Sequence, residues 1–225
     1  MRHDTRPFDS KATAAEYLAA YRALPDRKAR TVWVFRRAFA RSLEQESPEH
    51  VHQVARELFQ NSDNPGHASA LLMLHSATFQ TLGEAEIEEF GQGIDSWGTV
   101  DTFARWLSGP AWLRRQISDD VIRRWALSED RWWRRAALVS TVALNVRSHG
   151  GYGDSPRTLG ICRLLVGDRD DMVVKALSWA LRELVAHDPV AVEAFMREHE
   201  DALAARVKRE VRNKLRTGLK NPARG

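Results

Sequence analysis

The sequence predicts an all-α protein whose helices stack as repeats into a solenoid. Apolar residues recur at helical spacing along nearly the whole chain, and no segment alternates apolar and polar residues as a strand would. Two matching helical segments lie 40 residues apart, a period typical of HEAT-like arrays, in which helix pairs form an α-α superhelix. Short loops favour a solenoid over a bundle, because a solenoid forms from locally paired helices. We therefore expect one repeat domain over residues 1–225, with a concave binding face.

Helices in the first part of the chain are marked by apolar stripes and one capping signal. The stripes predict helices over about 17–24, 32–43 and 67–80. Ser47 and Pro48 are the residue types of an N-cap and a first helical position, so another helix begins there and runs to about residue 60. The polar segment 61–66 ends it.

The remaining helices follow one another with short loops. The same periodicity predicts them over about 84–91, 95–108, 110–117, 119–127, 131–147, 156–166, 170–186, 188–198 and 200–218. The repeat signal lies among them: segments 135–138 and 175–178 occupy equivalent helix positions, and each follows a short Asp-Arg segment. The glycine-rich segment 150–153 lacks the preceding strand and the Lys-Ser/Thr of a P-loop, so we interpret it as a flexible turn between repeats.

Composition excludes several classes of protein. Lys and Arg number 34 against 30 Asp and Glu, which gives a net charge of +4 and a pI near 9.5. Cys162 is the single cysteine, which excludes an internal disulfide and a multi-cysteine zinc site, and its apolar neighbours predict a core position. No stretch reaches the roughly 18 uncharged apolar residues of a membrane span, and the first residues are charged, so we expect no membrane contact.

The positive charge is concentrated at the C-terminus. From Arg206 to the end there are eight Lys and Arg residues and one acid, Glu210. Apolar residues fall four apart here, at Leu203, Val207, Val211 and Leu215. The basic helix over about 200–218 can therefore dock through one side and present its cations to phosphates, unless it is only a solvated surface helix. The phosphate contacts that we predict on it are Lys208, Arg209, Arg212, Lys214 and Arg216.

Tryptophan is frequent, with eight residues, and core packing is the ordinary role of each. Trp97 and Asp101 stand four apart in a predicted helix and so share one helix face. The alternative for Asp101 is a structural ion pair with Arg105, one turn later. Lys175 and Trp179 repeat the same spacing, with a core tryptophan beside a peripheral lysine as the alternative.

A second charged segment, Trp132-Trp133-Arg134-Arg135-Ala136-Ala137, places two arginines beside an alanine pair. Small side chains allow close helix packing. We expect one of these arginines to be buried and the other solvated.

Three motifs, in their order and spacing, resemble the AlkD-like DNA alkylation-repair glycosylases. They are Trp97-x-x-x-Asp101, Trp133-Arg-Arg-Ala-Ala and Lys175-Ala-x-x-Trp179-x-Leu-Arg-Glu. The resemblance runs from about residue 90 to 187. It implies a HEAT-like enzyme that excises 3-methyladenine and 7-methylguanine, with bulkier cationic adducts accepted by some members, from double-stranded DNA. It also implies that no metal or other cofactor takes part.

The resemblance places the active site on Trp97, Asp101, Arg135 and Trp179. It adds Arg134, Lys175 and Arg182 to the DNA-binding set. We expect a monomer in the cytoplasm, associated with the nucleoid. The chain departs from the family at Gly98, where many relatives carry an acidic residue after the first tryptophan.

The chemistry that these residues would perform is glycosidic hydrolysis. A base alkylated at purine N3 or N7 is cationic and leaves readily, and positive charge then develops on the deoxyribose. A carboxylate such as Asp101 beside the sugar stabilises that charge and can orient the attacking water. Trp97 and Trp179 would flank the sugar and Arg135 would hold a neighbouring phosphate. Contacts made to sugar and phosphate from outside would not require base flipping.

Other functions remain as alternatives. The same surface could serve a noncatalytic binder of damaged or branched DNA, or a protein-interaction scaffold. The histidine pairs His50/His52 and His67/His75 lack metal-ligand companions at useful spacing, so we interpret them as surface or capping residues.

Overall fold

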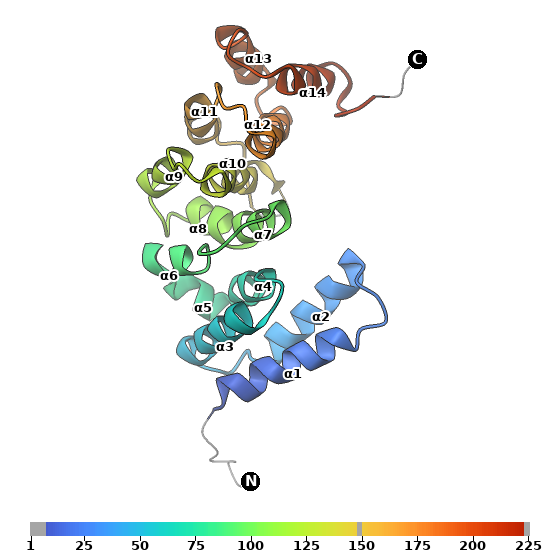
Figure 1. The fold of residues 1–225 in the computed structure, drawn as a ribbon, viewed down its shortest axis with the longest axis vertical. Coiled ribbons are helices and arrows are strands. Elements are labelled where there is room, and N and C mark those ends of the chain that lie inside the picture. The colour runs from blue at the N-terminus through green and yellow to red at the C-terminus, as the bar shows by residue number, and fades with distance from the viewer. Residues whose placement is uncertain (1–7, 148–149, 223–225) are drawn as a thin grey trace. The chain divides into compact units, whose positions relative to one another are not determined.

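The computed structural model describes residues 8–147 and 150–222, and none of these residues lies in a β-strand (Figure 1). The predicted all-α helical repeat fold is confirmed. The chain divides into two compact units, residues 1–90 and 91–225. The single HEAT-like domain stays a prediction. No helix in the described part of the chain is long and apolar enough to cross a membrane.

Unit 1 (residues 1–90) is a set of helices. They are α1 (Ser10–Arg22), α2 (Ala29–Ser42), α3 (Pro48–Asn61), α4 (Gly66–Leu74), α5 (Ser76–Thr81) and α6 (Glu84–Glu89). The predicted cap of α3 is confirmed, because the Ser47 side chain accepts a hydrogen bond from the His50 amide. The single helix expected over 67–80 is wrong. His75 has an extended backbone and its ring caps α5 by accepting from the Thr78 amide, so the helix is interrupted there.

Unit 2 (residues 91–225) holds the remaining helices. They are α7 (Trp97–Phe103), a π-helical turn η1 (Ala104–Ser108), α8 (Gly109–Leu113), α9 (Asp119–Ala126), α10 (Arg131–Asn145), α11 (Ser155–Leu164), α12 (Asp171–Leu184), α13 (Pro189–Glu198) and α14 (Ala205–Thr217). The break expected near Gly109 is wrong, since α7, η1 and α8 follow one another without a loop. The basic helix begins at Ala205 rather than near residue 200.

The helices of unit 2 form two layers, with α10, α12 and α14 packed in succession and α9, α11 and α13 on their other side (Figure 1). Asp130 and Asp170, 40 residues apart, cap α10 and α12 through their carboxylates. Arg135 and Lys175 each stand five residues after these caps. The 40-residue sequence period is therefore a structural repeat of capped helices.

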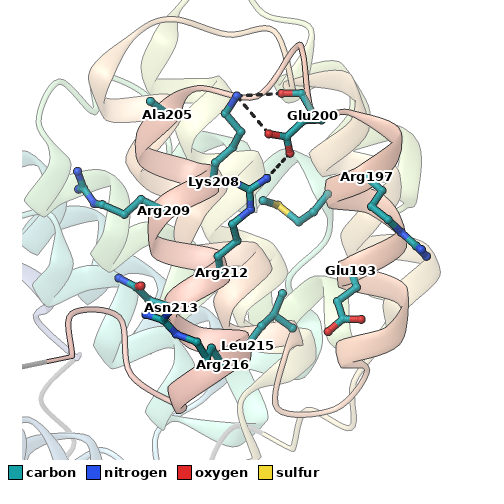
Figure 2. Close-up of a pocket in the computed structure, with 11 residues that line it drawn as sticks. Glu193, Arg197, Glu200, Ala205, Lys208, Arg209, Arg212, Asn213, Leu215 and Arg216 are labelled. Atoms are coloured by element: carbon teal, nitrogen blue, oxygen red, sulfur yellow. Dashed lines mark hydrogen bonds and ion pairs between the residues drawn. The ribbon is translucent and has the colours of Figure 1, made fainter. Parts of the chain in front are cut away.

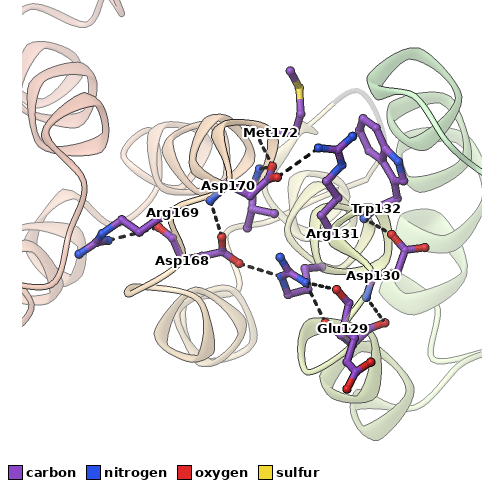
Figure 3. Close-up of polar contacts among 11 residues, drawn as sticks. Glu129, Asp130, Arg131, Trp132, Asp168, Arg169, Asp170 and Met172 are labelled. Atoms are coloured by element: carbon purple, nitrogen blue, oxygen red, sulfur yellow. Dashed lines mark hydrogen bonds and ion pairs between the residues drawn. The ribbon is translucent and has the colours of Figure 1, made fainter.

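Polar contacts tie the N-terminal ends of α10 and α12 together (Figure 3). Arg134 Nε donates to Asp168 Oδ2 at 2.7 Å, and its Nη1 donates to the carbonyls of Ser128 and Glu129. Arg131 pairs with Asp170 at 3.4 Å. The Arg134 side chain is only 20% exposed, so the expectation that one arginine of the pair is solvated is wrong.

The glycine-rich segment 150–153 is anchored to the end of α10. The amides of Tyr152 and Gly153 both donate to the Leu144 carbonyl at 3.0 Å. Gly153 has φ 91°, and a Cβ there would lie 2.5 Å from His187, so both conformation and space require glycine. The segment lies between α10 and α11, where a turn between repeats was expected, and its flexibility stays a prediction. Cys162 is a core residue as predicted, and burial raises the pKa of its thiol.

A buried polar cluster joins α1, α2 and α4 in unit 1. The His67 ring is 2% exposed, and its Nδ1 lies 2.8 Å from the Tyr17 hydroxyl and 3.3 Å from Arg36 Nη2. Because arginine can only donate, Nδ1 is the acceptor of the ring. The interpretation of His67 as a surface or capping residue is therefore wrong. Burial lowers the pKa of His67 to about 3 and raises that of Tyr17 to about 12.

This histidine makes folding stability depend on pH. The folded pKa of about 3 lies below the unfolded value of 6.5, so the unfolded chain binds more protons between these limits. The stabilisation is complete above pH 6.5 and is lost as the pH falls toward 3. We expect His67→Asn, which keeps an acceptor but cannot titrate, to reduce the loss of unfolding free energy between pH 6.5 and 5 by about 1–2 kcal/mol. Denaturant titrations of both proteins at the two pH values measure this, and equal losses would contradict it.

Candidate active site

The site is built on an ion pair between α7 and α10. Arg135 Nε donates to Asp101 Oδ1 and Arg135 Nη2 donates to Asp101 Oδ2, both at 2.8 Å. This fork geometry is the strongest form of a charge-assisted pair, and it fixes the plane of the carboxylate. The structure thus pairs Asp101 with Arg135 and not with Arg105, the partner that the alternative interpretation gave it. Residues 34 apart in sequence thus form one unit.

Arg135 is also held by a hydrogen bond to α12. Its Nη1 donates to the Met172 carbonyl at 2.5 Å, and its side chain is 6% exposed. These contacts use three of the five guanidinium N–H donors, which leaves two for another acceptor. The Asp101 side chain is 21% exposed, so the carboxylate is the more accessible partner.

Close packing of η1 and α8 against α10 sets the spacing of the helices that carry this pair. The Ser108 and Ser140 hydroxyls are 2.8 Å apart in the buried interface. A Cβ at Gly109 would lie 2.7 Å from the Ala104 carbonyl oxygen and 2.9 Å from the Ser140 carbonyl oxygen. Only glycine allows this approach. The π-helical turn and Gly109 therefore help to place Asp101 opposite Arg135.

Trp97 lies one turn before Asp101, as the first residue of α7. A capping box between Ser96 and Thr99 begins the helix there. Trp97 is 63% exposed, whereas Trp112 and Trp125 are buried in the core. An exposed indole of this size is not a core filler. It is available for contact with a ligand beside the carboxylate.

Gly98 occupies open space next to Trp97. A Cβ built at this position meets no heavy atom of the described residues within 4 Å. Packing therefore does not require glycine here. The departure from the family pattern leaves the surface beside Trp97 without a side chain at this position.

Trp179 lies in the wall of a cationic pocket of about 310 Å³, on the α12 side of Arg135. The lining residues are Arg135, Lys175, Trp179, Arg182, Arg206 and Lys220. We call this the Trp179 pocket. The indole Nε1 donates to Glu183 Oε1 at 3.0 Å, which fixes the ring. Five cationic side chains line the pocket together with this indole, so the pocket can accept an anion.

Buried Glu210 holds part of this pocket wall. Its Oε2 accepts from the Ser178 hydroxyl at 2.6 Å, and Arg182 and Lys220 lie 3.9 and 3.5 Å away. Burial lowers the pKa of Arg182. The only acid of the basic C-terminal segment is therefore an internal anchor, which docks α14 on α12.

Two pocket residues, Arg206 and Lys220, were missed by the sequence reasoning. Arg206 faces α12, because its Nη2 lies 3.7 Å from Oδ1 of Asp171, the first residue of that helix. Lys220 follows the C-cap Gly218, whose left-handed backbone, φ 73°, turns the chain after α14. Arg206 stands four residues before Glu210 on the same helix, and this spacing was the signal that could have placed it on the same side. No local signal placed Lys220 beside Glu210.

The cations predicted on the basic helix lie mostly elsewhere. Lys208 and Arg212 both bind Glu200, at 3.5 and 2.6 Å, in a groove of about 910 Å³ between α13 and α14 (Figure 2). Arg209 and Arg216 line the same groove. Lys214 donates to the Gly218 carbonyl and helps end the helix. The structure does not bring these residues to the Asp101–Arg135 pair, and their contact with DNA stays a prediction.

Of the residues predicted from sequence, the structure gathers one group around this pair. Trp97 and Asp101 share α7, Asp101 binds Arg135, and Arg135 lines the pocket that holds Trp179. Lys175 and Arg182 lie in the same pocket, whereas Arg134 is engaged at the helix N-termini. Among residues 8–147 and 150–222, no group of His, Cys, Asp and Glu side chains is arranged to hold a metal ion.

The arrangement combines an oriented carboxylate, an exposed indole and an adjacent cationic pocket. The first two can stabilise a positive charge, and the third can hold a phosphate. A ligand with an anionic backbone and a reacting centre that becomes cationic fits both parts.

Comparison with known protein families gives a match over most of the chain. A family model described as DNA alkylation repair enzyme matches residues 27–215, which include Trp97, Asp101, Arg135 and Trp179. A comparison with curated proteins found no match.

Proposed function

The chain belongs to the family of DNA alkylation repair enzymes, and from this premise we propose that it is a DNA glycosylase for cationic alkylated purines in duplex DNA. The substrates would be 3-methyladenine and 7-methylguanine. The observation that supports this proposal most is the Asp101 carboxylate, fixed by Arg135 one turn from the exposed Trp97.

The reaction is hydrolysis of the N-glycosidic bond. The bond between the purine nitrogen and C1′ breaks, and its electron pair moves to the base, which neutralises the alkylated ring. The sugar then carries an oxocarbenium charge. Water adds to C1′ and loses a proton to solvent, which leaves an abasic site and the free base. The lesion is already a good leaving group, so a general acid is not required.

Asp101 would lower the barrier by electrostatics. A carboxylate beside the sugar interacts with the developing cation more strongly in the transition state than in the ground state. The same oxygens can align the attacking water. The bidentate contact with Arg135 keeps the carboxylate in one orientation, so little reorganisation accompanies the reaction.

The two tryptophans would form the cradle of the sugar. An indole face attracts a cation, and exposed Trp97 lies on the same helix face as Asp101. Trp179 lines the same cationic pocket as Arg135. Arg135 would act first as the positioning partner of Asp101, and its two remaining donors can reach a phosphate in the Trp179 pocket. This sharpens the phosphate-clamp role that the resemblance implied.

A site that contacts the sugar and phosphate of the DNA does not need to enclose the base. The cations of the Trp179 pocket suit a phosphate, and selectivity would then arise from the lability of the cationic lesion rather than from a base pocket. We propose that the base stays stacked during excision.

Release of free base from duplex DNA tests this proposal. We expect release of 7-methylguanine well above the spontaneous rate and no comparable release of uracil, because uracil is a neutral and poor leaving group. Methylated and uracil-containing duplexes incubated with the protein, with the free bases separated and quantified, give the answer. Uracil release at a similar rate would contradict selection by lability.

Two triple variants distinguish the cationic surfaces. Lys175→Gln/Arg206→Gln/Lys220→Gln is expected to weaken binding of duplex DNA and to flatten its salt dependence by up to about one unit for each phosphate that the variant no longer binds. Lys208→Gln/Arg209→Gln/Arg212→Gln should have the smaller effect, because these three residues line the α13–α14 groove and not the pocket that Arg135 lines. Fluorescence anisotropy over a salt series measures both variants. If the second variant weakened binding more than the first, the duplex would lie along the α13–α14 groove.

A noncatalytic DNA binder is the second candidate. It is favoured by the same ion pair, because Arg135 partly compensates the charge of Asp101. Duplex binding without release of 7-methylguanine would support this function over the glycosylase.

A further inference from the structure

Asp171 is an acidic side chain placed among the cations of the Trp179 pocket. Its Oδ2 lies 2.6 Å from Lys175 Nζ, and its Oδ1 lies 3.7 Å from Arg206 Nη2. Both cations line the pocket. The Asp171 side chain is 57% exposed, so a ligand that enters from solvent meets the carboxylate and the two cations together.

The cap of α12 does not depend on this carboxylate. Asp170, the preceding residue, caps α12, because its Oδ1 accepts from the amides of Met172 and Val173. Asp171 is the first helical residue and its contacts are made to pocket side chains. The hydrogen bond from Lys175 lowers the pKa of Asp171, so the group is charged at neutral pH.

We propose that Asp171 occupies, in the free protein, the two cations that a DNA phosphate contacts in the complex, and thereby limits the affinity for undamaged duplex. The inference rests on the proposed function, since it takes the Trp179 pocket as the phosphate site. It assigns Asp171 as a residue that limits DNA affinity through the phosphate contacts and does not touch the reacting sugar.

Electrostatics give the sign and size of the effect. A phosphate oxygen bound to Lys175 Nζ and a carboxylate oxygen 2.6 Å from the same nitrogen lie within about 5 Å of each other. Two like charges at that distance repel even at the dielectric constant of water, by enough to weaken binding about four-fold. The repulsion acts on every phosphate that enters, so it shortens contact with undamaged DNA as well as with lesion sites.

The test is the affinity of Asp171→Asn for an undamaged duplex. Asparagine keeps the side-chain shape and removes the charge, so we expect binding about 3- to 10-fold tighter at low salt, with a salt slope steeper by up to about one unit. Asp171→Glu retains a carboxylate and should bind with an affinity close to that of the wild type. Fluorescence anisotropy with the same labelled duplex measures all three proteins.

Asp120→Asn is the matched control. Asp120 also lies in the first turn of a helix, α9, and pairs with an arginine three residues later, and its side chain is 89% exposed. The substitution removes the same charge from the same kind of helical position in the second helix layer. Its affinity for the duplex should change by less than about two-fold, which separates a local effect from a general gain of positive charge.

The outcomes are distinct. If the wild type binds the duplex and Asp171→Asn binds equally or more weakly, the inference is overturned and the proposed function is untouched. Weaker binding would mean that Asp171 orients Lys175 and Arg206 for the phosphate. A wild type that binds no duplex would overturn both. An equal gain in Asp120→Asn would show that net charge alone sets the affinity, and would also overturn the inference.

Discussion

Asp101→Asn is expected to lower the single-turnover rate of 7-methylguanine release by about 100-fold or more while leaving duplex affinity nearly unchanged. The reason is the loss of the charge that stabilises the oxocarbenium transition state, for which one preorganised group is worth about two to three orders of magnitude. Affinity is preserved because the phosphate contacts lie in the Trp179 pocket. Single-turnover release and anisotropy on the same methylated duplex measure the two quantities separately.

The same substitution is expected to destabilise the protein, and this loss of stability must be measured separately from the loss of reaction rate. Asparagine leaves the Arg135 guanidinium, whose side chain is 6% exposed, without its charged partner. Breaking a buried pair by changing one partner costs about 3–5 kcal/mol, and the 21% exposure of Asp101 places this pair near the lower limit. Thermal unfolding of the variant measures the loss of stability.

The double variant Asp101→Asn/Arg135→Met is the control. Replacing both charged partners removes the unpaired guanidinium, so part of the lost stability should return. Excision should stay low, because the carboxylate is still absent. A double variant with restored excision would show that Asp101 acts only by pairing with Arg135, and Asp101 would leave the proposed mechanism.

Gly109→Ala is expected to lower excision by about 10- to 100-fold and to destabilise the protein, although it lies outside the site. The added Cβ would come within 2.7–2.9 Å of two carbonyl oxygens and of the Ala143 Cβ. Backbone atoms cannot rotate away, so η1 and α8 must move from α10. Overpacking of this kind costs about 1–3 kcal/mol, more than the roughly 1 kcal/mol that alanine gains over glycine in a helix.

The loss of activity in this variant follows from the position of Asp101. The carboxylate is carried by α7, which continues into η1, whereas its partner is carried by α10. A displacement of about 1 Å at a reacting centre can cost about two orders of magnitude in rate. Single-turnover release and thermal unfolding of Gly109→Ala measure the two effects.

Gly98→Ala is the matched control, because it makes the same change earlier in the same helical run, in open space. We expect stability to rise by up to about 1 kcal/mol and excision to stay within about two-fold of the wild type. Equal effects of the two substitutions would contradict the role assigned to the close contact at Gly109.

Part of this site could be predicted from the sequence. The four-residue spacing of Trp97 and Asp101 predicted a shared helix face, and α7 contains both. Arg135 was chosen over Arg134 by resemblance, and the structure gives the physical difference between them: one binds the Asp101 carboxylate, and the other binds Asp168. The two arginines are adjacent in the sequence, and the local pattern alone did not separate them.

Other features depended on tertiary interactions that no local signal encodes. From the sequence, His67 was interpreted as a surface or capping residue, but α1 and α2 pack over it in the fold. Lys208 and Arg212 were predicted to be available for phosphate contacts, but the turn before α14 places Glu200 beside both of them. Charge counted along a helix does not show which of its members already has a partner.

The sequence by itself determined the helical class, the 40-residue repeat and the residue types of the site. The helical class and the repeat follow from periodicity and capping, which act within one or two helical turns, whereas the site residues follow from the resemblance to a known family. Tertiary structure alone decided that Asp101 faces Arg135, that Glu210 is an anchor, and that Asp171, Arg206 and Lys220 lie together at the Trp179 pocket. Their partners lie far apart in the chain, and only helix packing fixes the distances between them.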